Sequence, residues 1–243
     1  MDELIPELSI VVPCHNEEGN LEALAAEIRD TLAPLAIPYE VVITDDGSTD
    51  RSWDVLRKIA CADTNVRIQR FETNCGESGA SWAGIQAARA QLIITLDADR
   101  QNDPREIPRF LDALRIFDCV CGMRTKDRGH GDSQLKIVSS RVANWVRNTL
   151  TGDRIADSGC TYRAFRRECI ERIRAFNGMH RFLPTLIRME GHTVTEIAIS
   201  NRPRTSGRSH YGIWKRGLTA FIDLLAVCWM RRRMLKYRIV DAQ

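Results

Sequence analysis

Short apolar runs alternate with longer amphipathic segments through the first half of the chain. The runs predict strands at LSIVVP (8–13), YEVVITD (39–45), VRIQRF (66–71), LIITL (92–96) and FDCVCGM (117–123). Between them, helical spacing predicts helices over 21–32, 53–59, 75–90 and 104–117. Strands that alternate with helices of this length indicate right-handed βαβ units and a mostly parallel sheet. The predicted fold class is therefore α/β.

The regular alternation ends after Arg124. A polar loop, TKDRGHGDSQ, precedes a helical pattern over 135–152, and DSGCTYRAFRRECIERI predicts a strand that enters a helix. HTVTEIAISNRPR predicts an edge strand. We expect one domain over 1–243, with a nucleotide-binding half (8–124), an acceptor-side extension (125–211) and a C-terminal segment (212–235).

Polar residues follow one predicted strand after another. The carboxyl ends of parallel strands meet at one edge of a sheet, where ligands bind. Four clusters in succession therefore predict a functional site. Its members are Asn16 and Glu17, Asp45 and Asp46, Asp97 and Asp99, and Arg124.

The overall charge is nearly balanced, with 35 Lys and Arg against 32 Asp and Glu, and gives no reason to expect nucleic-acid binding. The charges are unevenly distributed, because acids dominate the first hundred residues and arginines the second half. This asymmetry indicates a metal- or base-binding half and an anion-binding half. The N-terminus is acidic and lacks a long apolar run, so no secretory signal is expected.

The eight cysteines are scattered through predicted strands and helices, and none of their spacings matches a zinc site. We expect reduced thiols of a cytoplasmic protein. Cys119 and Cys121 would lie on one face of a strand as small core residues.

The C-terminal apolar stretch LTAFIDLLAVCWM (218–230) is shorter than the roughly twenty residues that a spanning helix needs. Basic residues flank it on both sides, and Trp214 and Trp229 lie at its boundaries. Two interpretations fit: an interfacial helix on a membrane surface, or a final core helix with a solvated basic tail.

Three residues after the fourth predicted strand suit a divalent cation. Asp97 and Asp99 could both reach one ion, and Gln101 could add a neutral oxygen. Hard oxygen ligands of this kind favour Mg²⁺ or Mn²⁺. In the alternative interpretation an aspartate caps the next helix, which is the better explanation for Asp103 because Pro104 follows it.

Asp45 and Asp46 have a similar ambiguity. Residues of this kind stabilise turns and begin helices, but acids can also accept hydrogen bonds from a ribose or a base. Their position after a hydrophobic strand, between PCHNEE and DAD, favours nucleotide binding.

The motifs PCHNEEGN, DDGSTD, LDADRQNDP, GMR, DSGCTYRAFRR, HRF and NRPRTSGRSHYG occur in this order between residues 8 and 211. Together they resemble family 2 glycosyltransferases with the GT-A fold, in the branch of dolichol-phosphate mannosyltransferases and bacterial polyprenyl-phosphate glycosyltransferases. The resemblance implies inverting transfer of a sugar, mannose or glucose, to a polyprenyl phosphate at the cytoplasmic membrane face. GDP-mannose or UDP-glucose would be the donor, and Mg²⁺ or Mn²⁺ the cofactor.

The resemblance also implies roles for individual residues. Asp99, Arg124 and Arg208 would be catalytic, and Asp97, Asp99 and Gln101 would bind the metal. The nucleotide would be bound by Pro13, Asn16, Glu17, Asp45, Asp46 and Asp97. The acceptor phosphate would be bound by Lys136, Ser140, Arg202, Arg204 and His210.

The chain departs from the family pattern at three places. His210 stands where relatives often carry a lysine. The motif DSGCTYR differs from the usual family sequence at this place, which leaves the role of Asp157 open. Many bacterial relatives end in two transmembrane helices and no segment here fits that pattern, so a separate membrane-protein partner is one expectation.

Two other functions stay open. A family 2 enzyme with a soluble or cell-wall saccharide acceptor would need a catalytic carboxylate, for which Asp157 is the candidate. A catalytically silent subunit that binds nucleotide sugars is the other, although the intact DAD and GMR motifs count against it. A nucleotidyltransferase is disfavoured because the turn after the first strand is acidic rather than glycine-rich and basic.

Overall fold

The computed structural model describes residues 5–124, 144–202 and 213–235. The strands are β1 (Leu8–Cys14), β2 (Tyr39–Asp45), β3 (Val66–Arg70), β4 (Leu92–Thr95), β5 (Cys119–Arg124), β6 (Arg163–Arg166) and β7 (Val194–Ile199). The helices are α1 (Leu21–Leu32), α2 (Ser52–Ala62), α3 (Glu77–Ala87), α4 (Ile107–Ala113), α6 (Leu183–Met189) and α7 (Ile213–Arg233), and residues 144–151 are also helical. Short 3₁₀ helices are η1 (Ala33–Leu35), η2 (Pro104–Glu106), η3 (Arg167–Ile170) and η4 (Met179–Arg181).

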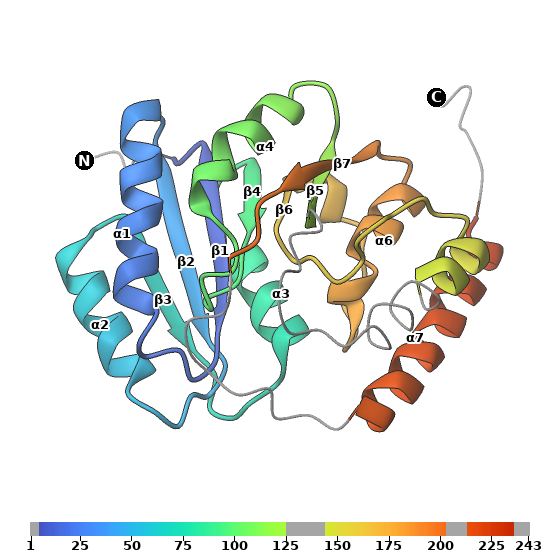
Figure 1. Ribbon diagram of the computed structural model, residues 1–243, viewed down its shortest axis with the longest axis horizontal. Helices are drawn as coiled ribbons and strands as arrows, with labels where there is room; N and C mark the ends of the chain where they lie inside the picture. The colour runs from blue at the N-terminus through green and yellow to red at the C-terminus, as the bar shows by residue number, and fades with distance from the viewer. Residues whose placement is uncertain (1–4, 125–143, 203–212, 236–243) are drawn as a thin grey trace, which may run out of the picture.

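The strands form one sheet in the order β3-β2-β1-β4-β6-β5-β7 (Figure 1). β1, β2, β3 and β4 pair in parallel, as do β5 and β7. β6 is antiparallel to both of its neighbours, β4 and β5. The sheet is therefore mostly parallel, as predicted, and a strand from the second half of the chain lies inside the sheet of the first half.

Helices cover both faces of this sheet because the strand side chains alternate between two apolar clusters. Ile10 and Val12 belong to the cluster that contains residues of α1, α2 and α4. Val11 belongs to the opposite cluster, which contains residues of α3, α6 and α7. Apolar side chains on both faces explain why these strands appear in the sequence as nearly continuous apolar runs.

The five strands predicted in the first half are confirmed, and β7 is the predicted edge strand. The expected helix after the strand at DSGCTYRAFRR is wrong in type, because the four residues after β6 form the 3₁₀ helix η3. The predicted helix over 104–117 begins with a 3₁₀ turn, η2, and continues as α4. Cys119 and Cys121 are buried in one apolar cluster, as predicted, and all eight cysteines are free thiols.

The C-terminal helix α7 has two different faces. Leu224 and Val227 are buried in the apolar cluster with α3 and α6. Phe221, Leu225 and Trp229 are exposed. Each of the two interpretations of this segment therefore describes one face: α7 packs on the core with one side and presents an apolar surface with the other.

Glu40 is a buried carboxylate that joins three strands. One oxygen accepts hydrogen bonds from Ser9 Oγ (2.7 Å) and from the backbone N–H of Arg89 (2.5 Å). The other accepts from Arg67 Nη1 (2.7 Å) and Arg89 Nε (3.1 Å). Burial opposes ionisation, but these donors outweigh it and lower the pKa of Glu40 below its ordinary value. The ionised carboxylate thus ties β1, β2 and β3 to the segment before β4.

Replacing Glu40 by Gln should lower the free energy of unfolding at pH 7 by about 1–3 kcal/mol, because charge-assisted hydrogen bonds become neutral or are lost. A lowered folded-state pKa stabilises the protein above the unfolded-state pKa, and this stabilisation is lost as the pH falls through the folded-state value. Urea unfolding should show a constant gap between wild type and variant from pH 7 to about pH 5, and a gap that shrinks as the pH falls below about 4. Exposed Glu22→Gln is the control; a gap that stays constant with pH would contradict this role of Glu40.

Candidate functional site

The ends of β1, β2, β4 and β5 place the predicted polar residues along one edge of the sheet. The register aligns the last residue of β1, Cys14, with the last residue of β2, Asp45. Beside them, Val11 of β1 pairs with Thr95 at the end of β4. The loops that begin at residues 15, 46 and 96 therefore all start at this edge (Figure 1).

Asn16 holds the first two loops together. Its φ is 56°, a left-handed conformation that Asn tolerates better than most residues. Its side-chain oxygen accepts hydrogen bonds from the backbone N–H groups of Thr49 (2.8 Å) and Asp50 (3.3 Å), and its own N–H donates to Ser48 Oγ (2.9 Å). In this structure Asn16 shapes the nucleotide-side loops, and its predicted contact with a nucleotide stays a prediction.

Pro13 and Glu17 flank this contact. Pro13 lies next to last in β1 and pairs with Thr44 of β2. Glu17 donates its backbone N–H to Ser52 Oγ (2.9 Å), and its carboxylate accepts from Asn20 Nδ2 (2.6 Å). Both residues therefore lie at the predicted edge of the sheet. Strand pairing fixes the backbone of Pro13, and the hydrogen bond to Ser52 fixes the backbone of Glu17.

Asp45 and Asp46 are buried and have structural partners. Asp45 forms an ion pair with Arg70 Nε (3.0 Å) and accepts from the N–H of Ser48 (3.2 Å). Asp46 accepts from the N–H groups of Cys75 (2.6 Å) and Gly76 (2.9 Å), directly before α3. The turn-forming alternative therefore describes the contacts of both residues, and nucleotide binding by them stays a prediction.

Asp97 is the residue on which the electrostatics of the site centre. Burial raises the pKa of this carboxyl, a hydrogen bond from Thr161 Oγ1 to Asp97 Oδ2 (2.5 Å) lowers it, and the nearby charge of Asp99 raises it again. The positive charges of Arg163 and Arg124 lower it further, but the net shift is upward. The protein thus leaves part of the charge at Asp97 uncompensated, which is the environment that a cation would relieve.

Hydrogen bonds between backbone N–H groups and side-chain oxygens stabilise the turn after Asp97. Asp99 Oδ1 accepts from the N–H of Gln101 (3.1 Å), and the N–H of Asp97 donates to Asn102 Oδ1 (3.2 Å). Asp103 accepts from the N–H of Arg105 (3.0 Å) and caps η2, so the predicted capping role of Asp103 is confirmed.

Within the part of the chain that the structure describes, no three His, Cys, Asp or Glu side chains converge as a complete metal site. Asp97 and Asp99 supply two carboxylates two positions apart, and the pKa of Asp97 is raised, which fits a cation whose remaining ligands would be phosphate oxygens and water. These residues fit Mg²⁺ or Mn²⁺ better as a site shared with a diphosphate than as a site built by protein alone.

Arg124, at the end of β5, is held by Asp157. Arg124 Nε donates to Asp157 Oδ2 (2.6 Å) and Arg124 Nη2 to Asp157 Oδ1 (2.8 Å), a two-pronged ion pair. This pair raises the pKa of Arg124. Since Arg124 also acts electrostatically on Asp97, the arginine lies near the carboxylate site in a fixed orientation.

Arg202, predicted to bind the acceptor phosphate, has carboxylate partners in this structure. Its guanidinium forms ion pairs with Glu27 of α1 (2.7 Å) and with Asp103 (2.7 Å), and its N–H donates to the carbonyl of Gln101 (3.0 Å). In this structure Arg202 therefore joins α1, the 97–103 turn and the end of β7, and its predicted contact with an acceptor phosphate stays a prediction. The other predicted acceptor and loop residues, Lys136, Ser140, Arg204, Arg208 and His210, lie outside the described residues.

Several residues near Asp97 were not predicted. A small pocket is lined by Ser78, Thr95, Thr161, Arg163 and His180, among others. Ser78 Oγ and His180 Nδ1 are 2.6 Å apart, and Arg163 donates to the carbonyl of His180 (2.5 Å). The motifs DSGCTYR and HRF contain three of these residues, but spacing alone could not show that they meet beside Asp97.

The family follows from comparison with known proteins. Residues 9–174 match the model described as "Glycosyl transferase family 2". Dodecaprenyl-phosphate galacturonate synthase of Rhizobium johnstonii is 34% identical over 231 residues, which cover 93% of this chain and 68% of that protein. This chain belongs to glycosyl transferase family 2, and the predicted family is confirmed.

Other similar proteins point to the same branch. An undecaprenyl-phosphate 4-deoxy-4-formamido-L-arabinose transferase of Aeromonas hydrophila is 34% identical, with coverage of 85% of this chain and 63% of that protein. The chain thus spans about two thirds of the length of these relatives.

The predicted GT-A fold is confirmed by solved structures. Glucosyl-3-phosphoglycerate synthase of Mycobacterium tuberculosis, crystallised with Mn²⁺, UDP and phosphoglyceric acid, superposes with a TM-score of 0.69 at 18% identity. The alignment covers 92% of this chain and 78% of the other. At this identity the likeness shows the fold alone.

Replacing Asp46 by Ala should lower the free energy of unfolding by about 1–2 kcal/mol, because the N–H groups of Cys75 and Gly76 lose their acceptor at the start of α3. Chemical denaturation beside Glu72→Ala, an exposed acid a few residues before the helix, would measure the difference. Equal stability of the two variants would contradict the capping role of Asp46.

Proposed function

We propose that this protein is a glycosyltransferase that moves a sugar from a nucleoside diphosphate sugar to a polyprenyl phosphate. The observation that carries the proposal is the likeness, at 34% identity over 93% of the chain, to a protein named for synthesis of a prenyl-phosphate-linked sugar. The Asp97 and Asp99 carboxylates with Arg124 nearby supply groups suited to a diphosphate.

The sugar is proposed only as a class. Mannose or glucose was expected from the motifs, but the named relatives carry galacturonate or formamido-arabinose. We therefore favour a donor whose sugar is a uronic acid or a modified pentose over GDP-mannose or UDP-glucose. A panel of donors is needed to decide both the sugar and the base.

Asp97, Asp99 and Gln101 are the residues proposed to hold Mg²⁺ or Mn²⁺. When bound there, the cation would offset the negative charge that develops on the leaving diphosphate. The raised pKa of Asp97 supports this assignment, because a nearby positive charge would favour the ionised carboxylate. Thr161 orients that carboxylate through its hydrogen bond to Oδ2.

The bond changes require little from a protein base. A phosphate monoester has a second pKa of about 6, so much of the acceptor is dianionic at neutral pH. Its oxygen would form a bond to the anomeric carbon from the face opposite the departing nucleoside diphosphate, and the configuration would invert. No proton needs to leave a dianionic acceptor, and the main barrier is repulsion between two phosphate groups.

Arg124 is proposed to reduce that repulsion. Asp157 holds its guanidinium through two hydrogen bonds, and this fixed orientation reduces the reorganisation needed during reaction. Lys136, Ser140, Arg204, Arg208 and His210 are proposed to contribute on the acceptor side, on the motif resemblance alone. Arg202 is proposed for the same side, where it would have to share its guanidinium with Glu27 and Asp103.

A peripheral position at the cytoplasmic face of a membrane is proposed for the protein. No helix among the described residues is both long and apolar enough to cross a bilayer. The exposed apolar face of α7 supports contact with a membrane surface. A membrane-protein partner, expected from the departure from many relatives, has no support among the described contacts and stays a prediction.

Radiolabelled transfer from GDP- and UDP-linked sugars into lipid extracts, with polyprenyl phosphate and Mn²⁺ or Mg²⁺, tests the proposed function. Asp99→Ala should reduce transfer by about 100-fold or more, because the developing charge loses its stabilisation. Asp112→Ala, on the exposed side of α4, is the control and should retain activity. Donor binding without any lipid product in the wild type would instead support a silent subunit or a saccharide acceptor.

Asp157 separates the proposed function from the saccharide-acceptor alternative. If Asp157 positions Arg124, Asp157→Asn should lower kcat/KM about tenfold and leave the pH profile unchanged, since the amide keeps one acceptor. A general base would give a loss of about 100-fold or more and remove one limb of the pH profile. Steady-state kinetics with lipid and saccharide acceptors, across a range of pH, distinguishes the two roles.

A further inference from the structure

A second pocket lies away from the strand ends, between the helical segment 144–151, α6 and the last turns of α7. It is open and has a volume of about 670 Å³, within the range of pockets that hold small ligands. Its lining includes Gly152, Asp153, Arg188, Met189, Arg231 and Arg232. We call it the arginine pocket, and no role in sugar transfer has been given to it above.

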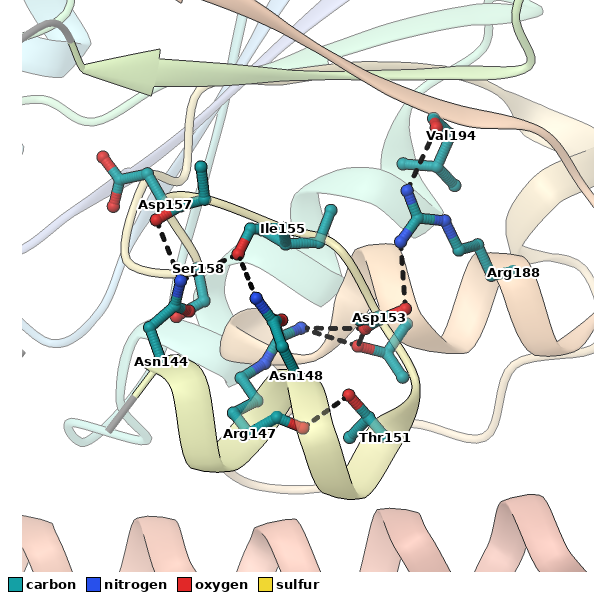
Figure 2. Close-up of polar contacts among 12 residues, drawn as sticks. Asn144, Arg147, Asn148, Thr151, Asp153, Ile155, Asp157, Ser158, Arg188 and Val194 are labelled. Carbon is teal, nitrogen blue, oxygen red and sulfur yellow. Dashed lines mark hydrogen bonds and ion pairs between the residues drawn. The ribbon is translucent and has the colours of Figure 1, made fainter. Parts of the chain in front are cut away.

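Asp153 forms the floor of the arginine pocket and is fully engaged. Figure 2 shows it between Arg147 and Arg188. Asp153 Oδ1 pairs with Arg188 Nη1 (3.0 Å), and Oδ2 with Arg147 Nη2 (3.3 Å) and with the hydroxyl of Thr185. The negative charge of Asp153 is therefore already matched by two guanidinium groups, and the floor is a rigid structure rather than a cation site.

Arg231 and Arg232 add positive charge above this floor. No carboxylate of residues 5–124, 144–202 or 213–235 forms an ion pair with either one. Three lining arginines thus face one lining aspartate, an excess of two positive charges. This excess of positive charge favours an anion as the ligand of the pocket.

Gly152 allows Arg231 to lie at the wall of the pocket. Its φ is +65°, and a Cβ atom there would come within 2.6 Å of Arg231 Nη1. The absence of a side chain at this position lets the guanidinium approach the backbone closely. The planar fork of an arginine at this position suits the oxygens of a phosphate group.

An exposed apolar surface extends from the arginine pocket along α7. Phe221, Ile222, Leu225 and Trp229 are between 49% and 63% exposed, and their spacing places them on one side of the helix. Trp145, on the neighbouring helical segment 144–151, is 68% exposed. A ligand with a phosphate beside hydrocarbon matches both surfaces at once.

We propose that the arginine pocket binds the phosphate of an anionic phospholipid while the apolar face of α7 enters the lipid surface. Arg231 and Arg232 contact the phosphate, and Trp229 and its neighbours contact the acyl region. None of the described residues that line the arginine pocket is among those proposed to bind the polyprenyl phosphate acceptor. The inference rests on the proposed membrane contact of α7, but not on the sugar or on the catalytic residues.

Co-sedimentation with vesicles of phosphatidylcholine, with and without phosphatidylglycerol, tests the proposal on the full chain. Arg231→Gln should weaken binding to the phosphatidylglycerol vesicles about thirtyfold, because a charge-assisted hydrogen bond is lost. Arg233→Gln removes the same charge two residues further along α7, outside the pocket, and should weaken binding only about fivefold through the diffuse attraction of the surface. Equal losses in the two variants would overturn the proposal in favour of unspecific surface charge.

Two further variants separate the contribution of the Arg231 guanidinium from that of the apolar face of α7. Arg231→Lys keeps the charge but not the fork and should remain at least about tenfold weaker than wild type. Trp229→Ala should weaken binding to both kinds of vesicle and leave the preference for phosphatidylglycerol intact. Circular dichroism of each variant checks that the fold is retained.

A soluble phosphate compound is the competing ligand. Glycerol phosphate carries the headgroup chemistry without acyl chains, and calorimetry should show at most millimolar binding. Tight binding of glycerol phosphate with no preference for phosphatidylglycerol vesicles would overturn the lipid assignment. Sugar transfer to polyprenyl phosphate in detergent should be unchanged in Arg231→Gln. Failure of transfer in the wild type would disprove the proposed function, and the result of vesicle binding would be unaffected.

Discussion

The constraint on which the site depends is the desolvation of the Asp97 carboxyl at the end of β4. Loss of hydration raises the pKa of this carboxyl, and the neighbouring charge of Asp99 raises it further. The hydroxyl of Thr161 and the charges of Arg163 and Arg124 lower the pKa of Asp97, but they offset this increase only in part. A carboxylate that is left partly uncompensated in this way suits the proposed cation, whose positive charge would favour the ionised form.

The surrounding acidic residues have partners within the protein. Asp45 is paired with Arg70, Asp46 accepts two backbone N–H groups, and Asp157 is bound by Arg124. These contacts keep most of the negative charge near the strand ends neutralised by the fold itself. Asp97 differs from these acids because its pKa is raised, which supports the proposal that it binds a metal rather than maintaining a loop.

The same separation of roles extends to the arginines. Arg124 and Arg163 act on the carboxylate site, whereas Arg202 joins α1 to the turn after β4. Arg231 and Arg232 lie at a different surface, beside the exposed face of α7. The arginines of the second half of the chain therefore lie in at least three separate places, and only the first of these groups is proposed to act near the reacting groups.

Local patterns in the sequence determined much of this protein. Apolar runs defined the strands, the polar residues that follow them defined the edge of the site, and Asp103 before Pro104 defined a helix cap. These features depend on residues that are neighbours along the chain, so periodicity and spacing reveal them. The motif order was also enough to indicate the family.

Only the tertiary structure decided which charged and polar groups lie in contact. Thr161 donates to Asp97, 64 positions away in the sequence, and Arg202 pairs with Glu27, 175 positions away. The insertion of β6 between β4 and β5 brings Thr161 to Asp97, and no local pattern predicts it, because strand order depends on how distant segments pack together.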